Sequence, residues 1–211
     1  MQTPRGRFVR MQHTEMTTSR LEAFSDGVIA IIVTIMVLEL RAPAQPSWPA
    51  LLKILPIFIS YGLSFLIVAI MWVNHHHMIH AVRRVTARLL WSNLNLLFWM
   101  SLVPFVTDFL GKNYRAPMAV ALYGLDLTMC ASAFYILRAE LIRQEPDLEL
   151  KEYHRGVQRK NGLSFLLYLS SAPLAHVSVF LSFAIFALIP ALYFLPERKL
   201  ARGAAIGSAP E

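Results

Sequence analysis

The stretch that decides the fold is RLEAFSDGVIAIIVTIMVLEL, which runs from Arg20 to Leu40. About 20 mostly apolar residues match the thickness of the hydrocarbon core of a bilayer, so this stretch predicts a membrane-spanning helix. It nevertheless carries Ser25, Asp26 and Thr34. A carboxylate at membrane depth is costly unless protein groups surround it, and therefore Asp26 marks a site with a structural or functional purpose.

The composition of the whole chain is that of a membrane protein. Of 211 residues, 56% are hydrophobic, and the mean hydropathy is +0.49. The length allows about six spans of roughly 20 residues and leaves no room for a separate catalytic domain. We expect the formal net charge of +7 to lie in cytoplasmic loops and not in a nucleic-acid site. The single cysteine, Cys130, excludes a disulfide within the chain.

Further apolar segments predict five more spans. Three of them cover about 49–72, 87–110 and 116–137, and Pro104 is expected to kink the second of these three. The last apolar block, 161–195, would be about 50 Å long as one straight helix, more than a bilayer needs. We therefore expect two short antiparallel helices there, with a turn near Ala175–Ser178 that Pro173 and His176 mark.

The distribution of Lys and Arg orients these spans. Most of them fall on one side of the six predicted helices, and the other side holds only Arg41, Lys53, Lys112 and Arg115. By the positive-inside rule both termini are cytoplasmic, which requires an even number of spans. The expected organisation is a cytoplasmic tail over 1–19, a membrane domain over 20–196 and a second cytoplasmic tail over 197–211. The first tail has no apolar core, so it is not a cleavable signal peptide.

The first predicted helix has two different faces. At 100° per residue, one apolar stripe contains Phe24, Val28, Ile31, Thr34, Ile35 and Leu38. Ser25 and Asp26 lie more than about 100° from its centre and are expected to point into the protein. We expect a buried polar cluster that joins three helices, whose candidate members besides Asp26 are Arg20, His75, His76, Asn93 and Asn95. The stripe alone does not distinguish a pore lining from ordinary helix packing.

A run of histidines follows the second predicted span. His76 and His80 are four residues apart and would share a helix face, a spacing that can bind a metal ion. No second cluster of metal ligands matches the run elsewhere, so we predict no metal site and expect the imidazoles to bond to neighbours or water. Neither a catalytic set nor a phosphate-binding loop is present, which indicates a protein that is not an enzyme and needs no cofactor. The filter sequence of ordinary potassium channels is also absent.

Several motifs resemble the transmembrane protein 175 family, a group of potassium channels. The first span reads Arg20-x-x-x-Phe24-Ser25-Asp26 before its apolar part. The later spans show Ser64-Phe65, Trp72-x-Asn74-His75-His76, Leu90-Trp91-x-Asn93, Ser101-Leu102-x-Pro104-Phe105-x-Thr107 and Tyr123-Gly124. The resemblance covers nearly the whole chain and is most specific in the first three spans. The departures from the family pattern are His77, His80, Asn95 and Asp108.

The resemblance implies an all-α channel with six transmembrane helices per subunit and no re-entrant filter loop. It implies a homotetramer in the cell's inner membrane, with the first helix of each subunit lining a central pore for potassium. Ile31 would form the constriction, Ile35 and Leu38 would line the pore, and Thr34 would favour K⁺ modestly over Na⁺. The family's structural motif falls on Arg20, Phe24, Ser25, Asp26, His76 and Asn93.

The residues themselves leave two other functions open. A small transporter of protons or divalent metal ions could use Asp26 and the His75–His80 run as a relay or a binding site. Such a transporter predicts a flux that depends on pH or on metal. A membrane scaffold is the third possibility, and it predicts no flux at all.

Overall fold

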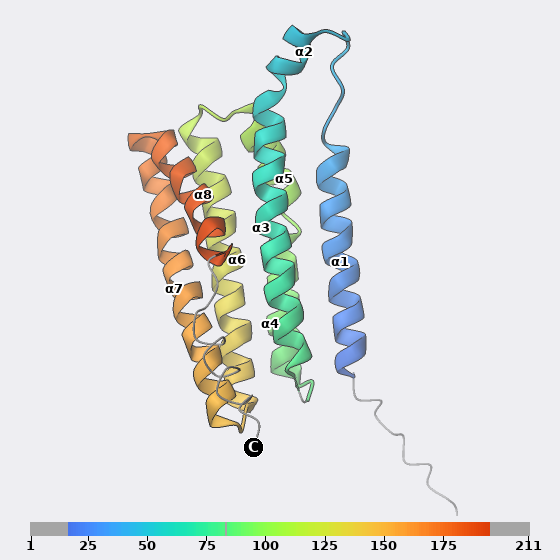
Figure 1. The fold of residues 1–211 in the computed structure, drawn as a ribbon, viewed down its shortest axis with the longest axis vertical. Helices are drawn as coiled ribbons and strands as arrows, with labels where there is room; N and C mark the ends of the chain where they lie inside the picture. The colour runs from blue at the N-terminus through green and yellow to red at the C-terminus, as the bar shows by residue number, and fades with distance from the viewer. Residues whose placement is uncertain (1–16, 83, 195–211) are drawn as a thin grey trace, which may run out of the picture.

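The computed structural model describes residues 17–82 and 84–194, and it is all-helical over this part of the chain. Most of the two predicted tails lies outside these residues. Figure 1 shows long helices side by side, with α1 at one edge and α7 and α8 at the other. The helices are α1 (Thr18–Leu38), α2 (Trp48–Lys53), α3 (Leu55–His80), α4 (Ala87–Met100), α5 (Val103–Lys112), α6 (Pro117–Gln144), α7 (Leu148–Val177) and α8 (Val179–Phe194).

Within the described residues, four helical segments are long and apolar enough to cross a membrane: Thr18–Leu38, Leu55–His80, Ala87–Lys112 and Pro117–Gln144. The third of these consists of α4 and α5, which are separated at Ser101 and Leu102. The kink expected at Pro104 is present as this break, because proline has no N–H to donate to the preceding turn. These segments indicate a multi-pass membrane protein, while the total of six spans stays a prediction.

The apolar block after residue 160 forms a helical hairpin, as the sequence predicts. α7 ends at Val177, Ser178 adopts an extended backbone, and α8 begins at Val179 and returns alongside α7 (Figure 1). Ser182 Oγ donates a hydrogen bond of 2.8 Å to the carbonyl of Ser171, which ties the two helices together near the turn. Pro173 lies inside α7 and not in the turn that it was expected to mark.

Polar side chains tie α3, α5 and α6 together inside the apolar core. Thr107 Oγ1 donates to Ser64 Oγ over 2.8 Å, and Ser64 Oγ lies 2.8 Å from the hydroxyl of Tyr123. All three side chains are buried. Hydrogen bonds and close backbone contact hold helices together in a bilayer, because lipid tails compete for apolar contacts. This network therefore fixes the central three helices as one unit.

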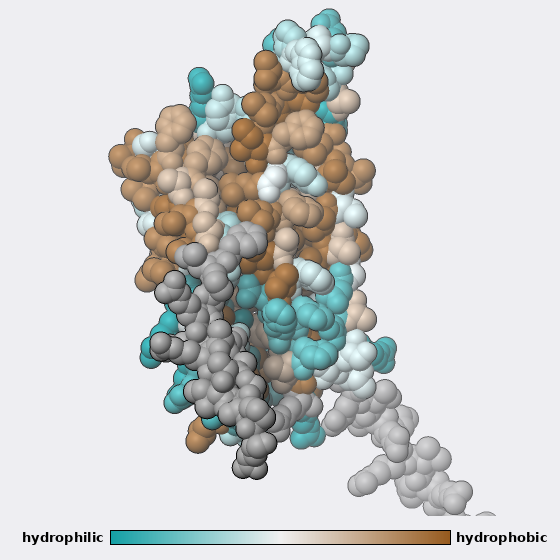
Figure 2. All heavy atoms as spheres, viewed as in Figure 1, coloured by the Kyte–Doolittle hydropathy of each residue, from teal (hydrophilic) through white to brown (hydrophobic). Residues whose placement is uncertain are grey.

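The surface divides along the helix axis. In the view of Figure 2, apolar residues cover most of the upper part below the hydrophilic residues at its very top, and hydrophilic residues gather again toward the lower end. The beginning of α1 and the end of α3 lie at that lower end (Figure 1). This is the end that the distribution of Lys and Arg predicts to be cytoplasmic, and we call it the inner end.

Gly111 allows α3 and α5 to approach closely. A Cβ atom added at Gly111 would lie 2.9 Å from the backbone Cα of Ile57, whereas one added at Gly62 would meet nothing within 4 Å. We therefore expect Gly111→Ala to lower the thermal unfolding midpoint in detergent by several degrees. Gly62→Ala, on the open side of α3, is the matched control and should leave the midpoint unchanged or slightly raised. Equal midpoints for both variants would contradict close packing at Gly111.

Candidate functional site

α1 has one face packed on the protein and one open face. The buried side chains are Leu21, Ser25, Ile29, Ile32 and Met36. On the opposite side, Ile31, Ile35 and Leu38 are 58%, 42% and 75% exposed. Val28, which the sequence also assigns to the stripe, is half-buried against the core. The open face is therefore a continuous apolar strip that a single copy of the chain leaves uncovered.

Thr34 places one hydroxyl group on this open strip. Its side chain is exposed, and its Oγ1 donates a hydrogen bond of 2.8 Å to the carbonyl of Ile31. Threonine in a membrane helix commonly bonds back to its own helix in this way. Since the proton is used inside the helix, the oxygen keeps its acceptor capacity for groups outside it. The strip thus offers one neutral oxygen ligand among bulky aliphatic side chains.

A buried polar network joins α1, α3 and α4 near the inner end. Asn93 Nδ2 donates to Ser25 Oγ over 3.0 Å, and Asn93 Oδ1 lies 2.7 Å from His75 Nε2. Ser25 in turn donates to the carbonyl of Leu21 over 2.8 Å. Because the amide oxygen can only accept, the proton of the His75 ring lies on Nε2. The structure therefore contains a buried polar cluster that joins three helices. It includes the expected His75 and Asn93, but its member on α1 is Ser25 and not Asp26.

The histidine in this network is His75, one of the two candidates that the sequence offers, whereas the family resemblance implies His76. Neighbouring residues of a helix point about 100° apart, so only one of the two can face the core. His75 is 1% exposed, while the Nδ1 atom of His76 lies 3.1 Å from Glu22 Oε1 at the α1–α3 boundary. The sequence pattern locates the pair correctly but does not give the rotation of α3.

Asp26 has a partner that the sequence analysis does not consider. The indole Nε1 of Trp72 donates to Asp26 Oδ1 over 2.9 Å. Arg20, a candidate partner in the sequence, is exposed and forms no ion pair with Asp26 in the described part of the chain. The indole N–H can donate a hydrogen bond but cannot accept one. A tryptophan in the neighbouring predicted span was therefore a recognisable candidate partner for the Asp26 carboxylate.

A second carboxylate at membrane depth escaped the sequence analysis. Asp126 lies in the middle of α6, is 5% exposed, and its Oδ2 atom has no hydrogen-bond partner in the described residues. The signal was available, because any acidic residue inside a predicted span is expensive and calls for an explanation. Asp126 lies on a different helix from the open strip and contributes nothing to it.

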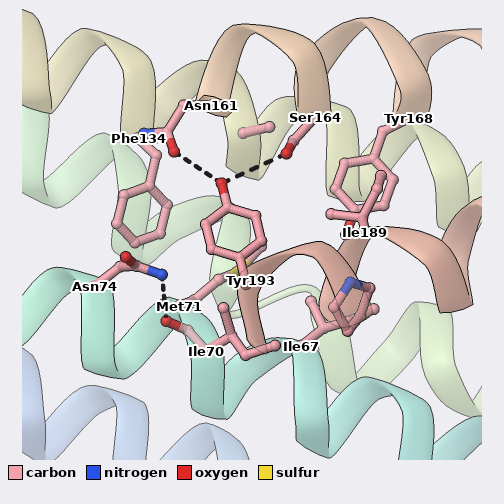
Figure 3. A pocket seen from close by; sticks show the side chains of 12 residues that line it. Ile67, Ile70, Met71, Asn74, Phe134, Asn161, Ser164, Tyr168, Ile189 and Tyr193 are labelled. Carbon is pink, nitrogen blue, oxygen red and sulfur yellow. Dashed lines mark hydrogen bonds between the residues drawn. The ribbon is translucent and has the colours of Figure 1, made fainter. Parts of the chain in front are cut away.

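A small cavity lies between α3, α6, α7 and α8, and its volume is about 50 Å³. Figure 3 shows Tyr193 at its centre, where the hydroxyl donates to Asn161 Oδ1 over 2.9 Å and lies 3.4 Å from Ser164 Oγ. Most of the other lining residues are apolar, and the Asn74 amide bonds to its own helix at the carbonyl of Ile70. The cavity contains none of the residues predicted as the site.

The chain is similar to several known proteins. Residues 20–104 match the sequence profile described as "Endosomal/lysosomal potassium channel TMEM175". A relative named as a potassium channel in Chryseobacterium sp. (strain P1-3) is 41% identical over 88% of this chain and 96% of its own length. Another, from Streptomyces collinus, is 34% identical over 84% of this chain and 91% of its own.

A solved structure shares the fold. The crystal structure of "a lysosomal potassium-selective channel TMEM175 homolog" from Chamaesiphon minutus superposes with a TM-score of 0.76 at 28% identity, covering 84% of this chain and 96% of that one. The relatives match along almost their whole length, and the structural match extends beyond the segment that carries the sequence profile. The chain therefore belongs to the TMEM175 family, which is a family of ion channels and not of enzymes.

Proposed function

We propose that the chain is a potassium-selective channel in which four copies surround a pore lined by α1. The observation that carries the proposal is the open strip of α1, which is apolar except for Thr34, on a helix whose other face is fixed by hydrogen bonds. The two bacterial relatives are named potassium channels, which supports the same function here. The permeant ion is the only ligand that this function requires.

Ile31 forms the constriction in this proposal, with Ile35 and Leu38 lining the pore on its outer side. Four bulky aliphatic side chains around an axis leave a narrow, dry ring, and such a ring stops ions by excluding water. The ring opens when the four copies of α1 move apart or rotate. Every one of these side chains is on the open face of α1 and so is available to a central axis.

Thr34 supplies the selectivity in this proposal. An ion that passes a narrow ring gives up part of its water, and four hydroxyl oxygens replace that water only weakly. The larger K⁺ ion loses water at a lower cost than Na⁺, so neutral oxygens favour K⁺. Because hydroxyl groups are weaker ligands than a full cage of carbonyls, the selectivity is modest.

The inner-end residues hold α1 in this orientation. Ser25, His75 and Asn93 form the buried network, with His75 in the place that the family resemblance implies for His76, and Asp26 is held by Trp72. Arg20 and Phe24 project to the open side of α1, where a neighbouring subunit would cover them. Both termini are cytoplasmic in this arrangement, and the protein lies in the inner membrane.

A divalent-metal transporter is the second candidate, because Glu22, Asp26 and His76 converge at the inner end of α1. The channel conducts K⁺ without a pH gradient and in the presence of a chelator, whereas the transporter does not. A planar-bilayer recording of the purified protein in asymmetric K⁺ and Na⁺, with EDTA and equal pH on both sides, separates the two.

Thr34→Val removes the hydroxyl group and keeps the shape of the side chain. We expect the K⁺/Na⁺ permeability ratio to fall toward 1, because no oxygen then replaces the lost water of the ion. The measurement is the reversal potential in mixed-ion bilayer recordings. Thr34→Ser, which keeps the hydroxyl, is the control and should retain most of the selectivity. A reversal potential that Thr34→Val leaves unchanged would place the filter elsewhere.

Ile31→Asn should let water into the constriction and raise basal K⁺ flux into liposomes severalfold. The control is Ile136→Asn on α6, because Ile136 is 50% exposed, close to the 58% of Ile31, but lies on another helix. Its flux should stay at the wild-type level. If Ile31→Asn conducts no more than the wild type, the narrowest point of the pore is not at Ile31.

Asn93→Leu should destabilise the subunit, because it leaves Ser25 and His75 without their buried partner. An unsatisfied buried polar group costs about 1–3 kcal/mol. We expect a lower midpoint in thermal unfolding followed by size-exclusion chromatography, together with loss of the oligomer peak. Asn95 is exposed on the same helix, so Asn95→Leu is the control and should behave like the wild type. Identical profiles for the two variants would show that the network does not hold α1.

A further inference from the structure

We propose that Glu22, Asp26 and His76 form a binding site for a transition-metal ion of the zinc class, which bridges α1 and α3. One potential ligand atom from each of these three side chains lies within 4.8 Å of the other two. Two carboxylates and an imidazole are a ligand set that zinc uses in proteins. The ion would be a bound regulator and not the cargo of the channel.

The site is built from two helix faces that oppose each other. Glu22 and Asp26 are four residues apart on α1, and His76 and His80 are four residues apart on α3, so each pair projects from one side of its helix. His76 Nδ1 lies 3.1 Å and His80 Nδ1 3.9 Å from the same oxygen, Glu22 Oε1. The two imidazole rings stack with centroids 5.9 Å apart. Three potential ligands thus converge at the helix boundary, and His80 lies beside them.

The distances are close to those of a metal site. Zinc binds nitrogen and oxygen at about 2.0–2.2 Å, which places the ligand atoms of a tetrahedron roughly 3.3 Å apart. The separations here, within 4.8 Å, need only small side-chain rotations to reach that value. The side chain of His80 is 77% exposed, and it would supply a fourth ligand by rotating toward the ion.

Two further observations indicate that these side chains are arranged to bind a cation. Trp72 Nε1 donates to Asp26 Oδ1, which orients the carboxylate and leaves its other oxygen available, as partners of metal ligands commonly do. His76 Nδ1 is a buried atom without a well-aligned hydrogen bond, although Glu22 Oε1 lies only 3.1 Å away. A bound cation would satisfy this nitrogen and both carboxylates at once.

The position of the site suggests its consequence for conduction, and this part rests on the proposed function. The ion would tie the inner end of the pore-lining helix α1 to α3. Opening requires α1 to pivot about its inner end, so a bound ion that stiffens this pivot should hold the closed state and lower K⁺ flux. Binding itself does not depend on conduction, and the two can be measured separately.

The binding experiment is titration calorimetry of the purified full-length protein with ZnCl₂ after treatment with EDTA. We expect about one ion per chain and at least tenfold weaker binding in Glu22→Gln and in His76→Gln. The matched control is His77→Gln, because His77 is exposed on the same helix and has no place in the cluster. Wild-type affinity in both ligand variants, or no binding by the wild type, would overturn the site.

The absorption spectrum of Co²⁺ gives a second readout that does not depend on activity. Cobalt bound by imidazole and carboxylates shows weak visible bands without the intense band of thiolate ligation, and the only cysteine, Cys130, is buried in α6. The bands should be present in the wild type and in His77→Gln and absent in His76→Gln. Each variant is first shown to keep the wild-type chromatographic profile in EDTA, so that a lost signal is not lost folding.

K⁺ flux into liposomes tests the regulatory consequence. Each protein is compared with its own flux in EDTA, and micromolar Zn²⁺ should lower the flux of the wild type and of His77→Gln but not of His76→Gln. If Zn²⁺ binds but the flux does not change, the proposed effect of the ion on α1 is wrong, whereas the binding site stands. A protein that binds Zn²⁺ but conducts no K⁺ in EDTA would instead contradict the proposed channel.

Discussion

The side-chain amide of Asn93 fixes the rotation of α1. It donates to Ser25 on α1 and its oxygen meets His75 on α3, and all three side chains are buried. A turn of α1 by one residue, about 100°, would break the bond to Ser25 and leave polar groups unpaired in an apolar core. The rest of the arrangement depends on this constraint, because the direction in which Ser25 points also determines the direction of the opposite face.

Because the rotation of α1 is fixed, the direction of its opposite face is fixed as well. With Ser25 turned inward, Ile31, Thr34 and Leu38 are directed away from the subunit, and their exposed side chains form the one strip of α1 that the chain does not cover. Lipid could cover such a strip, whereas in the proposed tetramer four copies of it surround a central axis and make a dry ring next to a layer of hydroxyl groups. In the proposed channel, the orientation of the side chains that face the ion therefore depends on a hydrogen bond on the opposite side of α1.

Local patterns predicted the features that depend on local chemistry. Hydropathy located α1, the apolar segment that contains α4 and α5, and the hairpin near Ser178. The helical period of 3.6 residues correctly placed Ser25 on the side of α1 away from the open strip. The sequence left both His75 and His76 as candidates for the buried cluster, because the rotation of α3, which places His75 there, depends on all its neighbours and not on its own sequence. The contact of Trp72 with Asp26 depends on the register between α1 and α3, which no periodicity encodes.

The contacts of α1 differ in kind along its length, and this bears on how it can move. Near the inner end α1 is held by directional bonds, from Asn93 to Ser25 and from Trp72 to Asp26. Farther out, Ile32 and Met36 pack through apolar contacts only, which permit sliding at a small cost. A movement that opens the ring and keeps the buried network intact must therefore pivot near the inner end and displace the outer part of α1.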